Sequence, residues 1–323
     1  MPALSSQSAR VTLALVLVYI VWGSTYLAIR VAIESIPPLL MAGARFLLAG
    51  VLLVAYARWK QRAPWPTVRQ WRDAAIVGAC LLLIGNGGVT LGEQFIPSGL
   101  AAMLVATVPM FMGLFGWWSG QSPRPRAIHA VALLVGFAGV CLLVRPTTPM
   151  VGTAPALPPA SLYTGSALVL LAAVVWAAGS LYAKRADRPG SAVLNIGAQM
   201  LCGGALLALA AVLHGEPARF HVLTVTARSA WAYLYLVFVG ALVGFSAYVW
   251  VLGAASPTLV GTYAFVNPGV AVFLGWAFAG ETVTNTTFLG MAIILASVAL
   301  IVLFPARPSP AAATPTAGRS SAS

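Results

Sequence analysis

The chain has 323 residues, of which 60% are hydrophobic and 7% are charged, and its formal net charge is +12. A water-soluble domain has about a quarter of its residues charged, so the 18 basic and 6 acidic side chains are too few to coat a soluble globule of this size. The basic residues form short clusters between apolar runs and not one solvated face, which argues against a nucleic-acid partner. We predict a bundle of membrane-spanning helices.

A membrane-spanning helix needs roughly 20 mostly apolar residues. The first apolar run follows the basic residue Arg10, and a secretory signal peptide has the same order of a basic segment before an apolar one. Its full length and its partner in the second half favour a spanning helix. We therefore predict an all-α membrane protein with ten transmembrane helices, near 12–30, 39–58, 72–91, 97–118, 127–144, 162–183, 192–213, 231–252, 257–279 and 286–304.

The distribution of Lys and Arg predicts the orientation, because these residues are retained on the cytoplasmic side. If the N-terminus is cytoplasmic, thirteen of the eighteen lie inside, four lie outside and Arg45 lies within a span. Both termini are therefore predicted to be cytoplasmic. The positive charge reports topology and does not indicate a polyanionic ligand.

The second half of the sequence weakly repeats the first. At an offset of 154 residues Trp22 matches Trp176 and Arg45 matches Gln199, and at an offset of 159 Pro109 matches Pro268. Five spans in each half is an odd number, so the halves are predicted to form two inverted five-helix repeats. The predicted segments are a cytoplasmic N-terminus (1–11), the first repeat (12–144), an extracytoplasmic Pro-rich linker (145–161), the second repeat (162–304) and a disordered cytoplasmic tail (305–323).

Polar and aromatic residues recur at helical spacing on several spans, which predicts faces turned toward a central cavity. Interfacial aromatic belts and hydrogen bonds between helices are the alternative explanation. This alternative fits Trp22 and Trp176 less well, because both lie in mid-span and not at the membrane interface. The predicted substrate-cavity residues are Trp22, Tyr26, Asn86, Thr90, Trp176, Ser180, Trp250, Tyr263 and Asn267.

Arg45 lies about seven residues, or about 10 Å, from the outer end of its span. Its guanidinium could extend to the headgroups, as long cationic side chains do. Alternatively it pairs with Glu34, Glu93 or Glu281 as an outer gate or contacts an anion. Glu93 and Glu281 are the candidate proton carriers, but both are predicted at helix ends, so a proton relay buried in mid-membrane is not indicated.

Pro109 and Pro268 are predicted in the middle of equivalent spans. Proline removes a backbone donor and frees the carbonyl four residues earlier. A matched pair of kinks favours a binding site or a hinge, and a structural kink is the alternative for either one alone.

Motifs for other activities are missing from the sequence. It contains no GxxxxGK[ST] nucleotide loop, and His129, His214 and His221 are predicted in loops or at their edges. No metal-ligand cluster or catalytic carboxylate pair is predicted within the bundle, so we expect no cofactor, no metal and no enzymatic activity.

Four segments carry a resemblance to a known family: YIVWGSTYLAIR (19–30), MAGARFLLAG (41–50), GNGGVTLGEQFIPSGLAAMLVATVP (85–109) and TYAFVNPGVAVFLGWAFAGE (262–281). The chain resembles the EamA type of the drug/metabolite transporter superfamily, in the branch of YedA-like inner-membrane permeases. The resemblance covers residues from about 12 to 304. Some relatives have a histidine after the helix-3 glutamate, but Gln94 stands there, which argues against assuming histidine-based proton coupling.

The resemblance implies a multi-pass protein of the inner membrane that exports small metabolites, such as amino acids or drug-like compounds, through a cavity surrounded by helices 1, 3, 4, 6, 8 and 9. Its partners would be a small-molecule substrate and the lipid bilayer. We expect alternating access of the two repeats. An uncoupled facilitator, an importer, a channel and a membrane scaffold remain alternatives, and proton coupling stays open.

Overall fold

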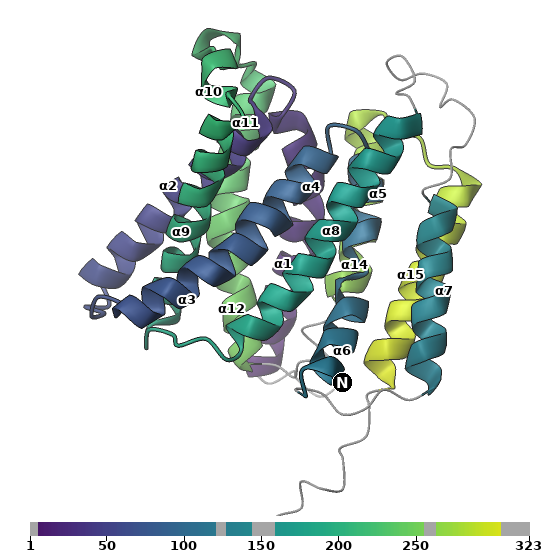
Figure 1. Ribbon diagram of the computed structural model, residues 1–323, viewed down its shortest axis with the longest axis horizontal. Coiled ribbons are helices and arrows are strands. Elements are labelled where there is room, and N and C mark those ends of the chain that lie inside the picture. Colours follow the sequence, from purple (N-terminus) through teal and green to yellow (C-terminus); the bar gives the residue numbers. More distant parts are fainter. Residues whose placement is uncertain (1–5, 121–126, 144–158, 255–262, 305–323) are drawn as a thin grey trace, which may run out of the picture.

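The computed structural model describes residues 6–120, 127–143, 159–254 and 263–304, and every regular element among them is helical (Figure 1). The predicted tail, nearly all of the predicted linker, and residues 255–262 at the start of the ninth predicted span lie outside these ranges. The elements of the first half are α1 (Ser6–Ala32), α2 (Pro38–Trp59), α3 (Val68–Gly78), the π-helix η1 (Ala79–Asn86), α4 (Gly87–Gly92), α5 (Ser98–Val105), α6 (Val108–Trp118) and α7 (Ala127–Leu143).

The second half follows a similar order. Its elements are α8 (Pro159–Ala183), α9 (Ala192–Leu213), the short α10 (Glu216–Arg219), the 3-10 turn η2 (Val222–Thr224), α11 (Ala227–Tyr235), the π-helix η3 (Leu236–Val243), α12 (Gly244–Ala254), α14 (Tyr263–Ala279) and α15 (Asn285–Leu303). α8 begins at Pro159, inside the predicted linker. α1 begins at Ser6, inside the predicted N-terminal segment, and the other helices follow the predicted spans to within about four residues at their described ends.

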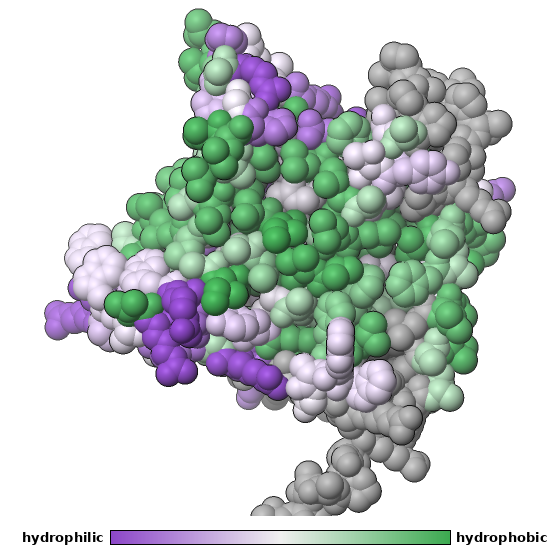
Figure 2. Space-filling view, viewed as in Figure 1, coloured by the Kyte–Doolittle hydropathy of each residue, from purple (hydrophilic) through white to green (hydrophobic). Residues whose placement is uncertain are grey.

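Seven helical stretches in the described part of the chain are long and apolar enough to cross a membrane. Three shorter apolar helices, Ala130–Leu143, Val266–Ala279 and Asn285–Ser297, correspond to the fifth, ninth and tenth predicted spans. Figure 2 shows hydrophobic residues across the middle of one face, with hydrophilic residues gathered above, near α10 and α11, and at the lower left. The long helices of the described ranges thus have the length and the apolar composition of membrane-spanning segments.

Local sequence signals set where several helices begin. Thr67 and Gln70 form a capping box at the start of α3, and Thr284 and Thr287 form one at the start of α15. Such reciprocal bonds satisfy backbone N–H groups that a helix start leaves free. Pro38 occupies the first turn of α2, where proline costs no helical hydrogen bond.

The third long helix of each half contains an eight-residue π-helix, η1 in the first half and η3 in the second. A π-helical segment is rare and is frequently found at functional sites. Each one ends beside a glycine that contacts a tryptophan, Gly85 near the end of η1 and Gly244 directly after η3. The same local irregularity therefore occurs twice in this chain.

α2 and α9 form an extensive contact in which glycines let the two backbones approach closely. A Cβ added at Gly43 would lie 3.3 Å from the carbonyl oxygen of Gly204, and one added at Gly50 would lie 3.1 Å from that of Gly197. The helices therefore run antiparallel at this crossing, with small residues at the contact as membrane helices require for close packing.

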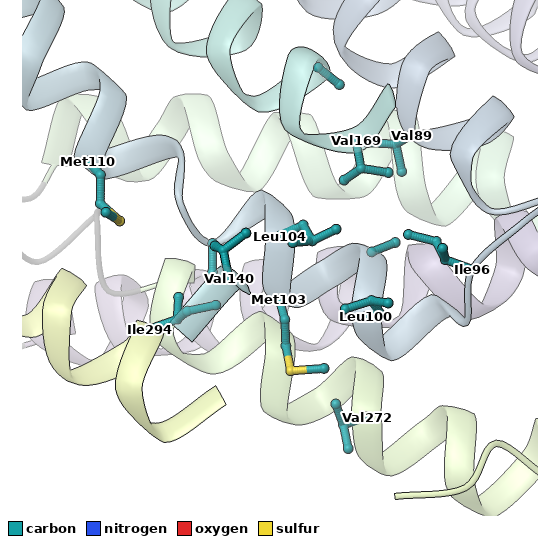
Figure 3. Close-up of a cluster of buried hydrophobic side chains, with 13 residues drawn as sticks. Val89, Ile96, Leu100, Met103, Leu104, Met110, Val140, Val169, Val272 and Ile294 are labelled. Carbon is teal, nitrogen blue, oxygen red and sulfur yellow. The ribbon is translucent and has the colours of Figure 1, made fainter. Parts of the chain in front are cut away.

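The largest buried apolar cluster gathers around α5 (Figure 3). Leu100, Met103 and Leu104 of α5 pack with Val169 of α8 and Val272 of α14. Because α5 belongs to the first half and the other two helices to the second, this cluster joins the halves along the length of α5.

Candidate functional site: a cavity between the two halves

A cavity lies between the halves, with about 110 Å³ accessible to the centres of water-sized molecules. About 10–15 Å³ in this measure holds one water, so the space suits several waters or a small organic molecule. Its walls come from α1, α2, the η1–α4 region, α5 and α6 of the first half, and from α8, η3 and α14 of the second. Apolar and aromatic side chains predominate, as in most small-molecule sites.

Most of the predicted cavity residues line this space, and three do not. The six that line it are Trp22, Tyr26, Asn86, Trp176, Tyr263 and Asn267. The side chains of Thr90 and Ser180 bond back to the carbonyls of Asn86 and Trp176, both at 2.8 Å. Trp250 lies 44% exposed in a separate groove beside Leu53 and Ile196, so its helical spacing from Ser246 does not bring it to the cavity.

Each mid-span tryptophan of one half packs on a glycine of the other. A Cβ added at Gly244 would lie 2.8 Å from Nε1 of Trp22, and one added at Gly85 would lie 2.7 Å from Cε3 of Trp176. Real side chains do not reach such separations, so only glycine leaves room for the rings. These two contacts fix both indoles in the cavity wall.

Trp22 of α1 and Tyr263 of α14, both in the wall, form an aromatic cluster with Tyr248 of α12, which lies outside the wall. The Trp22 ring lies 4.7 Å from that of Tyr248 and 5.4 Å from that of Tyr263, the second pair being edge-on. The side-chain amide of Asn267 is oriented with its nitrogen toward the backbone carbonyls of Tyr19 and Tyr263, and it donates a hydrogen bond to each at 3.2 Å. Tyr248, two residues before Trp250, was not among the predicted residues; its ring packs on that of Trp22 without lining the cavity.

The family resemblance placed the fourth predicted span (97–118) beside the cavity, but no residue of α5 or α6 was predicted to line it, and Pro109 was predicted only as a kink. Ala102, Val105, Ala106 and Pro109 line the cavity at the spacing i, i+3, i+4, i+7, which could have identified this face. Pro109 lies in the first turn of α6, after a break at residues 106–107, whereas Pro268 lies inside the continuous helix α14. The matched prolines therefore produce different backbones, although both reach the cavity.

Arg45 is buried in the wall with 3% of its surface exposed, and it does not extend to the headgroups. Its Nη2 donates to Oδ1 of Asn86 at 2.6 Å, and its guanidinium lies 4.2 Å from the Phe46 ring centroid. No carboxylate in the described part of the chain forms an ion pair with it. The structure thus shows neither the predicted pairing with Glu34, Glu93 or Glu281 nor snorkelling.

The three glutamates have other surroundings. Glu34 pairs with Arg228 at 3.8 Å. Glu281 accepts hydrogen bonds from Oγ and the backbone N–H of Ser98, both at 2.7 Å, and from the N–H of Gly99 at 3.1 Å. It therefore caps α5 with a negative charge, which is favourable at a helix N-terminus. This contact ties the second half to the first.

Glu93 follows the last residue of the third long helix and is completely buried. Neither carboxylate oxygen has a hydrogen-bond partner in the described part of the chain, while Nη1 of Arg30 donates to its backbone carbonyl. Burial is the main cause that raises the pKa of Glu93 well above its usual value, and the negative charge of Glu281 adds to it. The neutral, protonated form is therefore favoured at this end of the bundle.

The end of the cavity beside these glutamates is closed by packing. α5 contacts α1, α8 and α14, and the cluster in Figure 3 fills the space between them. Any path into the cavity through this end would have to separate α5 from the second half. That movement would break the bonds to Glu281.

The sequence profile of the EamA-like transporter family matches this chain twice, over residues 10–145 and 163–303. The chain belongs to the EamA-like transporter family. It is 37% identical over 301 residues to the inner membrane transporter YedA of Escherichia coli (strain K12), covering 91% of this chain and 92% of the relative. It is 27% identical to the transporter YvbV of Bacillus subtilis (strain 168), covering 90% of this chain and 91% of that one.

Another member of the family carries a more specific name. The chain is 24% identical to a probable amino-acid metabolite efflux pump of Escherichia coli (strain K12), covering 86% of this chain and 90% of the relative. A solved crystal structure matches with a TM-score of 0.58 at 20% identity, covering 91% of this chain and 97% of the other, which shows the fold alone. The protein is thus a multi-pass transporter of the inner membrane that handles small molecules.

Proposed function

We propose that the protein is a secondary transporter that exports small metabolites or drug-like compounds across the inner membrane by alternating access. The observation that carries this proposal is the cavity between the two halves, in which each half contributes a tryptophan that packs on a glycine of the other. A site shared by two similar halves can open to either side when they rock against each other.

The proposal includes ten transmembrane helices arranged as two inverted five-helix repeats, with both termini in the cytoplasm. The paired π-helices, the antiparallel crossing of α2 with α9 and the double match of the family profile support it. With this orientation, the closed end of the cavity beside Glu281 faces away from the cytoplasm. Export would then begin with loading from the cytoplasmic side.

Aromatic rings would enclose the apolar part of the substrate, and Asn86 and Asn267 would orient its polar groups. Thr90 would act indirectly by holding the backbone and amide of Asn86. We assign Glu93 and Glu281 to gating or coupling, and Arg45 to gating, coupling or contact with an anion. Export is favoured over import because a relative with 24% identity is named a probable amino-acid metabolite efflux pump.

The test is efflux from proteoliposomes that are loaded with a panel of amino acids and drug-like compounds, with and without an imposed pH gradient. Saturable, selective efflux that speeds up with the gradient is the expected result for a proton-coupled exporter. Selective efflux that ignores the gradient would identify a facilitator. Flux that does not saturate would identify a channel, and no flux of any compound would contradict the proposal.

A further inference from the structure

The charge in the described wall of the cavity is positive. Arg45 is the only charged side chain among the described residues that form its wall. Glu93 lies close enough to affect Arg45 electrostatically, but it is not part of the wall. Glu281 and Glu34 are engaged elsewhere, as described above. A solute in the cavity therefore meets a cation and no carboxylate.

The guanidinium of Arg45 keeps most of its hydrogen-bonding capacity. Arginine has five N–H donors in a fork that matches a carboxylate, and the described residues accept one hydrogen bond from it, at Asn86. Its Nε is enclosed without a partner in the described part of the chain. Because a buried charge is costly unless it is paired, an anion beside Arg45 would stabilise this arrangement.

The other side chains of the wall indicate which apolar group such an anion would carry. Trp22, Trp176 and Tyr263 line the same cavity, and indole and phenol rings bury large apolar surfaces and stack on other rings. An ammonium group would find ring faces and amide oxygens here, but it would also be repelled by Arg45. Lipophilic cations are disfavoured for that reason, and a zwitterion would leave its ammonium without a carboxylate partner.

We infer that the cavity binds a small organic monoacid, with its carboxylate on Arg45 and an aromatic or branched apolar body between the rings. This inference rests on the proposed function and narrows its substrate class. The preference is for a monoanion over a neutral amide, an amine or an α-amino acid of the same carbon skeleton. Asn86 is a positioning residue here, since its amide oxygen holds Nη2 of Arg45.

The test is equilibrium binding to the purified full chain in lipid nanodiscs, followed by quenching of tryptophan fluorescence. The probes share one skeleton: 3-phenylpropionate, its amide, 3-phenylpropylamine and L-phenylalanine. 3-Phenylpropionate should bind about tenfold or more tightly than each of the others, because the amide and the amine have no carboxylate for Arg45 and L-phenylalanine would bring an ammonium group beside it. Equal or tighter binding of any of the other three, or no binding of the acid, would overturn the inference.

Variants of Arg45 assign the binding to this side chain. Arg45→Met should lose about tenfold or more in affinity for the acid and none for the amide, while Arg45→Lys should keep part of the difference. Arg58→Met is the matched control, since Arg58 lies on the same helix, contacts Trp65 and donates to the carbonyl of Ala63. Acid binding by Arg45→Met with the affinity of the unaltered protein would overturn the inference.

The binding readout separates this inference from the proposed function. If the acid binds through Arg45 but no compound is transported, the exporter proposal fails and the binding site stands. If neutral or cationic compounds show saturable efflux and the acid does not bind, transport stands and the monoacid preference fails. Should Arg45→Met not fold, Arg45→Lys and the four probes on the unaltered protein decide the matter.

Discussion

The first half of the chain contributes Arg45 and Asn86 to the cavity, whereas the equivalent positions of the second half are Gln199 and Phe245. Gln199 donates to Asn195 within its own helix at 3.3 Å and does not line the cavity. The apolar features, in contrast, occur in both halves. Trp22 packs on Gly244, and Trp176 packs on Gly85.

Under the alternating access proposed above, this difference corresponds to two separate requirements of the site. The proposed rocking of the two halves would need similar packing in each half, and the contacts of Trp22 with Gly244 and of Trp176 with Gly85 occur in both. Amide side chains reach the cavity from both halves, Asn86 from the first and Asn267 from the second, whereas the one charged side chain of the described wall, Arg45, belongs to the first half. Four experiments test this difference between the packing and the charge of the two halves.

The largest effect is expected where the halves cross at α2 and α9. Gly43→Ala and the equivalent Gly197→Ala should each lower the stability by about 1–3 kcal/mol, because overpacking displaces neighbouring atoms. The new Cβ atoms would lie 2.9 Å from the backbone nitrogen of Ala208 and 2.8 Å from Cγ2 of Val54. Unfolding midpoints in detergent measure this effect. Gly269→Ala is the control, as no described atom lies within 4 Å of its added Cβ, and unchanged midpoints for both variants would refute the shared crossing.

The two tryptophans should matter for transport more than for insertion. Trp22→Ala and Trp176→Ala should each reduce saturable efflux by about tenfold, which corresponds to the loss of about 1.4 kcal/mol of solute contact. Trp22→Ala should also lower the unfolding midpoint more, because its ring contacts Tyr248 and Tyr263. Efflux is measured after the amount of protein inserted in the vesicles has been matched. Normal transport by both variants would show that the assigned cavity is not the substrate site.

A smaller effect is expected for the pH dependence of stability. The pKa of Glu93 is raised above its usual 4.5 on folding, so the native state binds this proton more tightly than the unfolded state. Its contribution is fully present below pH 4.5 and is lost as the pH rises through the folded pKa. The unfolding midpoint should therefore decline toward alkaline pH, and Glu93→Gln should flatten this decline. Glu34→Gln, at an exposed ion pair, should keep the slope, and an unchanged slope in Glu93→Gln would contradict the account.

The smallest effect is expected for Trp250. It lies in the groove beside Leu53 and Ile196 and not in the wall of the cavity. Trp250→Ala should therefore leave the rate of efflux and its saturation unchanged within error. A drop comparable with that of Trp22→Ala would mean that the path of the solute extends to α12.

Sequence reasoning predicted the helices well because apolar runs of spanning length constrain the chain strongly. It identified Trp22, Asn86 and Tyr263 because helical spacing places side chains on a common face. Helical spacing does not show whether a shared face points into the cavity or elsewhere. Trp250 shares a face with Ser246, but both lie in the separate groove. The environment of Arg45 could not be predicted either, since it depends on contacts between distant helices. The helix break before Pro109 likewise depends on how α5 packs.

The most direct test of the central claim is the accessibility of the cavity from the two sides of the membrane. Val105, which lines the cavity, is replaced by cysteine in a protein whose Cys80, Cys141 and Cys202 are changed to serine. Right-side-out and inside-out vesicles are then treated with a membrane-impermeant maleimide. The account predicts labelling from the cytoplasmic side alone without solute and added labelling from the outer side when a transported solute is supplied. Labelling from both sides without solute would indicate a channel, and labelling from neither side would show that this cavity is not the transport path.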